Sequence, residues 1–68
     1  MSAREYLTGP AAPLGDRLHN ERIRRGMTQV DLANRLGVHV GTVARWERAE
    51  MGFHPAQARE AEAWLKSG

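Results

Sequence analysis

Arginine supplies most of the side-chain chemistry in this sequence. Nine of the ten basic residues are arginines, and seven of them lie within residues 17–48. The same stretch holds only three acidic residues, so its net charge is +4. Each of the two flanking segments carries one more acidic than basic residue. A guanidinium donates paired hydrogen bonds to a phosphate or to the edge of guanine. A GC-rich genome would equally explain the excess of arginine over lysine, but not its clustering.

Other side-chain chemistry is sparse. The 68 residues contain no cysteine, which excludes disulfides, thiolate nucleophiles and cysteine-bound zinc. The three histidines have no metal-binding spacing with nearby carboxylates, so neither a metal nor a cofactor is expected. Because no catalytic triad and no glycine-rich phosphate loop can be placed, we predict that the chain is not an enzyme. No signal peptide or uncharged run of roughly 18–20 residues is present, so we expect no membrane association and a cytoplasmic location.

Periodic apolar residues predict an all-α domain without strands. Leu14 and Leu18 share one helix face, and a stripe that includes Ala61 and Leu65 marks another. The expected domain spans residues 14–68 and follows a flexible N-terminal arm over residues 1–13, which are rich in glycine and proline. The expected helices cover about residues 14–25, 29–36, 40–48 and 55–66, with an alternative end near Met51 for the third.

Turn and capping residues mark the ends of these helices. Gly26 and Gly37 each follow an apolar stretch, where a left-handed residue ends a helix. Thr28 with Asp31 three residues later forms a weak capping-box pattern. Pro55 suits the first position of the last helix. The two central helices are therefore short and joined by a turn containing Gly37, which is the sequence form of a helix-turn-helix.

One spacing covers about half of the chain: Gln29-x3-Ala33-x3-Gly37-x5-Val43-x2-Trp46-Glu47, preceded by Leu18-x3-Arg22 and Gly26-Met27-Thr28-Gln29. It resembles the Cro/C1-type (Xre) helix-turn-helix family of phage and bacterial repressors. The resemblance implies a compact four-helix, lambda-repressor-like fold that binds double-stranded DNA. It also implies that the helix after Gly37 lies in the major groove as the recognition helix.

The resemblance further implies which residues face the bases. They are Val40, Gly41, Ala44 and Arg45. Arg45 is the strongest candidate because it can donate two hydrogen bonds to guanine. Two explanations stay open for Gly41, namely close approach to DNA or an easier turn into the helix.

Contacts with the DNA backbone are expected from a second set: Thr28, Gln29, His39, Arg48 and His54. Thr28 also has a structural explanation as an N-cap. Arg22 and Glu47 match family positions that pair with each other, so we expect a structural ion pair between the first helix and the recognition helix. The other central arginines are expected to form a solvated face that attracts phosphate, namely Arg17, Arg24, Arg25 and Arg35.

Large apolar residues near the end of the chain suggest self-association. We expect Phe53, Trp64 and Leu65 to form a homodimer contact, with the alternative that Trp64 closes the core of a single chain. The expected function is that of a dimeric repressor of the Cro-like or operon-autorepressor type, such as those of anti-CRISPR operons, on an inverted repeat. The alternative is an antitoxin or adaptor that uses the same scaffold to bind a partner protein.

Overall fold

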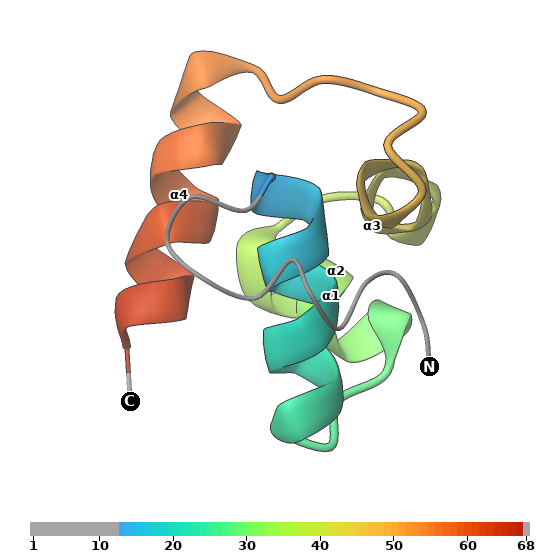
Figure 1. Cartoon of the computed structure of the whole chain (residues 1–68), viewed down its shortest axis with the longest axis vertical. Coiled ribbons are helices and arrows are strands. Elements are labelled where there is room, and N and C mark those ends of the chain that lie inside the picture. The colour runs from blue at the N-terminus through green and yellow to red at the C-terminus, as the bar shows by residue number, and fades with distance from the viewer. Residues whose placement is uncertain (1–12, 68) are drawn as a thin grey trace.

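The computed structural model describes residues 13–67, in which the chain forms four helices joined by short turns (Figure 1). No strand occurs in that range, so the predicted all-α fold is confirmed. The helices are α1 (Leu14–Arg24), α2 (Gln29–Leu36), α3 (Val40–Glu47) and α4 (Pro55–Lys66). The predicted N-terminal arm lies outside the described residues, apart from Pro13.

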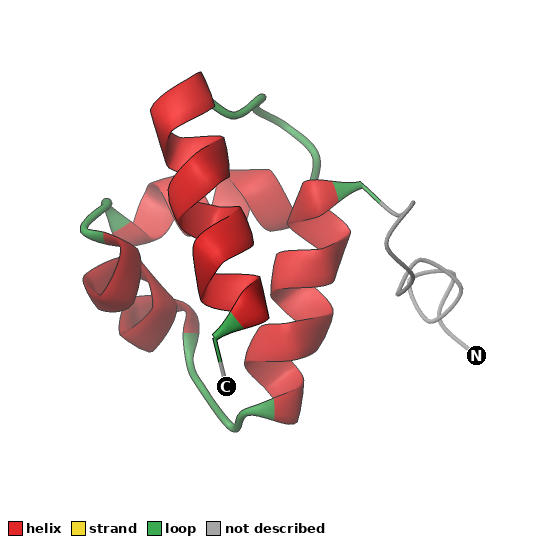
Figure 2. Ribbon diagram, turned by 90° about the vertical axis from the view of Figure 1, so that its left-hand side faces the viewer, coloured by secondary structure: helices red, strands yellow, loops and turns green. Residues whose placement is uncertain are grey.

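The four helices enclose one core. Figure 1 shows α1 between α4 on the left and α3 on the right, and Figure 2 shows the same arrangement turned by 90° with α4 in front. Both α1 and α2 pack against α3 and against α4. Apolar side chains from all four helices are buried between them: Leu18, Leu32, Ala33, Val43, Trp46, Ala61 and Trp64.

The closest approach between α1 and α3 is at Gly15. Gly15 is buried, and a Cβ atom there would lie 2.1 Å from the carbonyl oxygen of Trp46. That oxygen belongs to the backbone at the end of α3, so it cannot move aside alone. The absence of a side chain at Gly15 therefore sets how closely the two helices pack.

Two helices end in the same Schellman motif. At the end of α1, Gly26 has φ +70° and the Met27 N–H donates to the carbonyl of Arg22 at 2.9 Å. At the end of α3, Ala49 has φ 58° and the Glu50 N–H donates to the carbonyl of Arg45 at 2.8 Å. The alternative end of α3 near Met51 is therefore wrong, because Ala49 turns the chain out of the helix.

We predict that Ala49→Gly stabilises the fold. The left-handed region costs an L-residue about 1–2 kcal/mol, which exceeds the extra backbone entropy that glycine loses on folding. The net gain should be about 0.5–1 kcal/mol, or roughly 4 °C in the midpoint of thermal unfolding followed by circular dichroism.

The matched control is Gly26→Ala, at the equivalent position of α1. No atom lies within 4 Å of a Cβ built there, so only the conformational cost applies and the midpoint should fall. If Ala49→Gly lowered the midpoint, the left-handed conformation of Ala49 would not be the native one.

Candidate functional site

The outer face of α3 gathers most of the residues expected to contact bases. Val43, Trp46 and Glu47 turn inward and are buried, whereas Arg45 is exposed. Residues three or four apart share a helix face, which places Gly41 and Arg48 beside Arg45. The remaining expected residues, Ala44 and Val40, are half-buried.

Two residues of α3 differ from the expected arrangement. Val40 packs against the core, so only part of its side chain is open to a ligand. Thr42, which was not among the residues expected to contact DNA, is half-buried on the flank of the face that carries Arg45. Its spacing of three residues before Arg45 is the signal that would have found it.

His39 caps the N-terminus of α3. Its Nδ1 atom accepts a hydrogen bond from the backbone N–H of Gly41 at 2.9 Å. A Cβ at Gly41 would lie 3.0 Å from this Nδ1, so glycine leaves room for the capping ring. This gives Gly41 a local role in the cap of α3.

The N-terminus of α2 is closed by the predicted capping box, which is confirmed. The backbone N–H of Asp31 donates to Thr28 Oγ1 at 3.0 Å, and the backbone N–H of Thr28 donates to Asp31 Oδ2 at 2.9 Å. The second bond holds the pKa of Asp31 below its usual value. The first N–H groups of a helix have no partner inside the helix and favour an anion. At α2, however, the N–H of Asp31 is taken by Thr28 and the Asp31 carboxylate lies at the same end, so the N–H groups that remain for an anion are those of Gln29 and Val30.

Arg22 and Glu47 lie together, as the resemblance implied, in a network joining α1, α2 and α3. Arg22 Nε donates to Glu47 Oε2 at 2.8 Å and Arg22 Nη2 donates to Oε1 at 2.9 Å. Arg22 Nη1 donates to the carbonyl of Met27 at 2.9 Å. Two residues that were not expected there also donate to Oε1, namely His19 through Nδ1 at 2.7 Å and Gln29 through Nε2 at 3.3 Å.

Within this buried network, the carboxylate of Glu47 and the guanidinium of Arg22 are both charged. Burial by itself raises the pKa of Glu47, but the hydrogen bonds from Arg22, His19 and Gln29 outweigh it and hold that pKa below the usual value. The hydrogen bonds to Glu47 raise the pKa of Arg22. His19 could have been assigned to this group from its position, three residues before Arg22 on the same face of α1.

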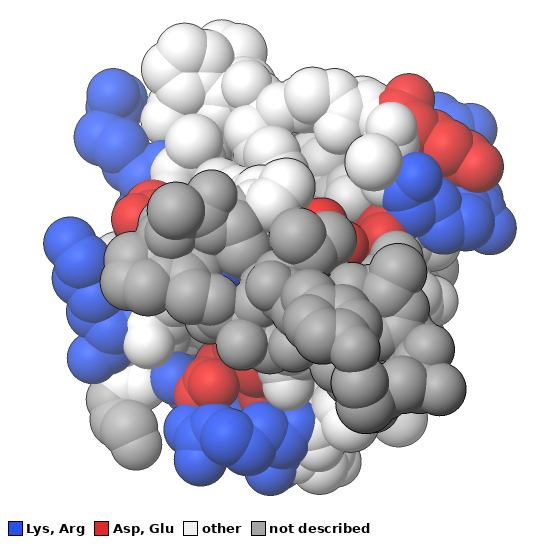
Figure 3. All heavy atoms as spheres, viewed as in Figure 1, with Lys and Arg blue, Asp and Glu red and all other residues white. Residues whose placement is uncertain are grey.

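The solvated face expected from Arg17, Arg24, Arg25 and Arg35 is found only in part, because Arg24 and Arg35 are exposed whereas Arg17 and Arg25 are half-buried. Arg17 pairs with Glu62 at 2.7 Å, and both Arg24 and Arg25 bind Glu21. The hydrogen bond from Arg24, which has the larger effect, and the hydrogen bond from Arg25 together lower the pKa of Glu21 to about 2. On the side drawn in Figure 3, several basic side chains correspondingly lie beside acidic ones.

Arg25 also holds the C-terminus of α4. Its Nη2 atom donates to the carbonyl of Trp64 at 3.2 Å and to that of Ser67 at 2.6 Å. Its guanidinium lies 4.2 Å from the centre of the Trp64 ring. Of the arginines in residues 17–48, only Arg35 and Arg45 have no ion-pair partner within the described part of the chain. The guanidinium of Arg45, on the outer face of α3, therefore takes part in no ion pair within the described residues.

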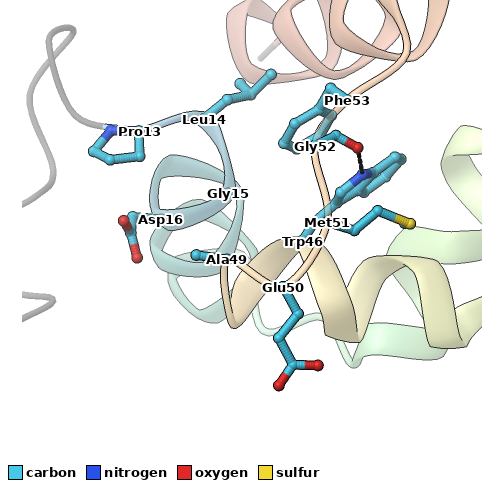
Figure 4. Close-up of a pocket in the computed structure, with 10 residues that line it drawn as sticks. All are labelled: Pro13, Leu14, Gly15, Asp16, Trp46, Ala49, Glu50, Met51, Gly52 and Phe53. Atoms are coloured by element: carbon cyan, nitrogen blue, oxygen red, sulfur yellow. Dashed lines mark hydrogen bonds between the residues drawn. The ribbon is translucent and has the colours of Figure 1, made fainter.

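The loop between α3 and α4 carries the last expected backbone contact and one expected dimer residue. His54 is exposed and caps α4, with Nδ1 accepting the backbone N–H of Ala56 at 3.2 Å. Phe53 stacks on Trp46 with ring centres 4.3 Å apart. The two rings line an open cleft of about 400 Å³, drawn in Figure 4 with the hydrogen bond from Trp46 Nε1 to the carbonyl of Gly52. In that view, Glu50 points away from the cleft.

The structure does not bring the three expected dimer residues together. Trp64 is 4% exposed in the core of the single chain, as its alternative explanation required. Leu65 is half-buried near the C-terminal end of α4, whereas Phe53 precedes its N-terminal end. A rise of 1.5 Å per residue puts these ends about 15 Å apart. A contact between protomers that used both Phe53 and Leu65 would therefore extend over about 15 Å of the surface.

In residues 13–67, no group of three or more histidine or acidic side chains is placed to hold a metal ion. None of the helices in that range is long and apolar enough to cross a membrane.

The geometry agrees with a comparison of the chain with known protein families. A family model described as a helix-turn-helix domain matches residues 13–64, which include all four helices up to Trp64. Neither the curated proteins nor the solved structures gave a match.

Proposed function

The chain belongs to the helix-turn-helix domain family, whose members bind DNA, and from that premise we propose that it is a sequence-specific, dimeric repressor of the Cro/C1 type. Its operator would be an inverted repeat. Each protomer would place α3 in the major groove of one half-site, with half-sites about one helical turn, or 34 Å, apart.

The main support for this proposal is that Arg45 is exposed and has no ion-pair partner among the described residues. Arg45 also lies on the same side of α3 as the small residues Gly41 and Ala44. Small neighbours let the helix backbone approach base edges, and a free guanidinium can make a bidentate contact with guanine. We propose that Arg45 reads a G·C pair in each half-site.

Backbone contacts would fix the depth and register of α3 in the groove. The proposed donors are the first N–H groups of α2, the Gln29 amide and the Nε2 atoms of His39 and His54. Arg48 pairs with Glu50 at 3.2 Å, but their side chains are 60% and 54% exposed. Such an exposed pair is weak, so Arg48 can exchange Glu50 for a phosphate.

Dimer formation is proposed because one short helix in one half-site gives weak binding. The half-buried residues Phe53 and Leu65 are the proposed contributors, while Trp64 has little surface left to offer. Sedimentation with and without duplex would give the number of protomers on each operator.

Arg45→Ala tests whether α3 distinguishes one base pair from another through Arg45. On a duplex selected by the unaltered chain, we expect the variant to lose about 1–3 kcal/mol of discrimination at one base pair while keeping its helical circular dichroism. Competition binding against duplexes with single base-pair changes measures this loss.

Arg35→Ala is the matched control, because Arg35 is also exposed and unpaired within residues 13–67 but lies on α2. It should leave the sequence preference unchanged. If Arg45→Ala retained the full preference, the assignment of Arg45 to base reading would be wrong. If the unaltered chain bound no duplex with preference, the adaptor or antitoxin alternative would gain support.

A further inference from the structure

Glu47 Oε1 is the point at which three helices meet in one hydrogen-bond network. It accepts from His19 Nδ1 on α1 at 2.7 Å, from Arg22 Nη2 at 2.9 Å and from Gln29 Nε2 on α2 at 3.3 Å. The Glu47 side chain is 2% exposed and that of His19 is 26% exposed. The network therefore extends from the buried core to the N-terminus of α2.

The carboxylate determines which way the Gln29 amide faces. An ionised carboxylate only accepts hydrogen bonds, so Gln29 must turn Nε2 and not Oε1 toward Glu47. This uses one of the two N–H hydrogens on Nε2. The other hydrogen is left for a second acceptor, and Gln29 is the first residue of α2, the end of a helix at which an anion is favoured.

The bond to Gln29 is the most easily lost of the three. At 3.3 Å it is longer than the usual range of about 2.7–3.2 Å for N–H···O hydrogen bonds, whereas the bonds from His19 and Arg22 lie within that range. Arg22 reaches both carboxylate oxygens from α1. The short bond from His19 is a second constraint on Oε1, the same oxygen that Gln29 uses.

We propose that His19 is a positioning residue for DNA binding, because through Glu47 it holds the Gln29 amide in the orientation that donates to a DNA phosphate. This rests on the proposed function. His19 need not touch DNA. Its ring proton is on Nδ1, because the carboxylate can only accept.

A double-mutant cycle on DNA affinity tests the proposal. The variants are His19→Ala, Gln29→Ala and the combination of both. The probes are the duplex selected by the unaltered chain and a mixed-sequence duplex of the same length, about 20 base pairs. A phosphate contact carries no sequence information, so both duplexes should respond equally. Each single change should weaken binding about fivefold, and the double variant should be no weaker than Gln29→Ala.

Two further variants separate positioning from a general effect on the fold. His19→Gln keeps a donor for Glu47 and should restore binding to within about twofold of the unaltered chain. His19→Phe keeps the ring volume without the donor and should behave like His19→Ala. Asn34→Ala, an exposed change on α2, is the control for substitution itself. All affinities are measured at a temperature where circular dichroism shows each variant fully folded.

Three outcomes would overturn the inference. Losses that multiply in the double variant, to about 25-fold, would mean that His19 and Gln29 act independently. Unchanged affinity in folded His19→Ala and His19→Phe, with only the unfolding midpoint lowered, would make His19 purely structural. Absence of duplex binding by the unaltered chain would overturn the proposed function itself, and this inference with it.

Discussion

Gly15→Ala is expected to destabilise the domain by about 3 kcal/mol, which lowers the unfolding midpoint by roughly 12–24 °C. The new methyl group would start 2.1 Å from the carbonyl oxygen of Trp46, and both are fixed to helix backbones. Relief requires α1 and α3 to separate, which opens the core around Trp46. Thermal and denaturant unfolding followed by circular dichroism measure the loss.

Gly52→Ala is the matched control, because it adds the same methyl group where nothing lies within 4 Å. Gly52 also lacks the left-handed φ of Gly26 and Gly37, so the substitution carries no backbone strain there. Its midpoint should equal that of the unaltered chain. If the unfolding midpoint of Gly15→Ala lay within about 2–3 °C of that of Gly52→Ala, α1 and α3 would have to be farther apart than the 2.1 Å separation at Gly15 implies.

Arg22→Ala is expected to cost about 3–5 kcal/mol, the range for breaking one half of a buried ion pair. The side chains of Arg22 and Glu47 are 9% and 2% exposed, so water cannot replace the lost guanidinium. Loss of Arg22 also leaves the carbonyl of Met27 without its donor. Arg24→Ala is the control, because Arg24 pairs with Glu21 at the surface and should change stability little.

The pH dependence of Arg22→Ala identifies the cause. In the unaltered chain the pKa of Glu47 is lowered on folding, so its contribution to stability is present above the usual glutamate pKa and lost as pH falls through the folded value. Without Arg22, burial raises that pKa and Glu47 can take up a proton. The deficit of Arg22→Ala should therefore shrink from pH 8 to about pH 5. A deficit independent of pH would point to lost packing.

The parts of the fold set by neighbouring residues could be predicted from the sequence. The left-handed turn at Gly26, the capping box of Thr28 with Asp31, and the start of α4 at Pro55 each depend on residues within one helical turn. The end of α3 was less certain because Ala49 adopts a conformation for which alanine gives no signal.

Contacts between distant residues could not be predicted in the same way. Nothing in the sequence indicates that Arg17 meets Glu62, 45 residues away. The contact of His19 with Glu47, 28 residues away, could be inferred only once Arg22, on the same face of α1, had been paired with Glu47. The expectation of a solvated basic face was wrong for Arg17 and Arg25 for this reason, since it took no account of their partners. The pairing of Arg22 with Glu47 was anticipated through the family resemblance and not from spacing alone.

Selection of binding sites from a random duplex pool by the unaltered chain tests the central claim most directly. We expect enrichment of an inverted repeat with half-sites about ten base pairs apart, and an affinity for the selected duplex that falls as the salt concentration rises. Weak binding with no enriched sequence would contradict it, because Arg45 on α3 would then have no base to read.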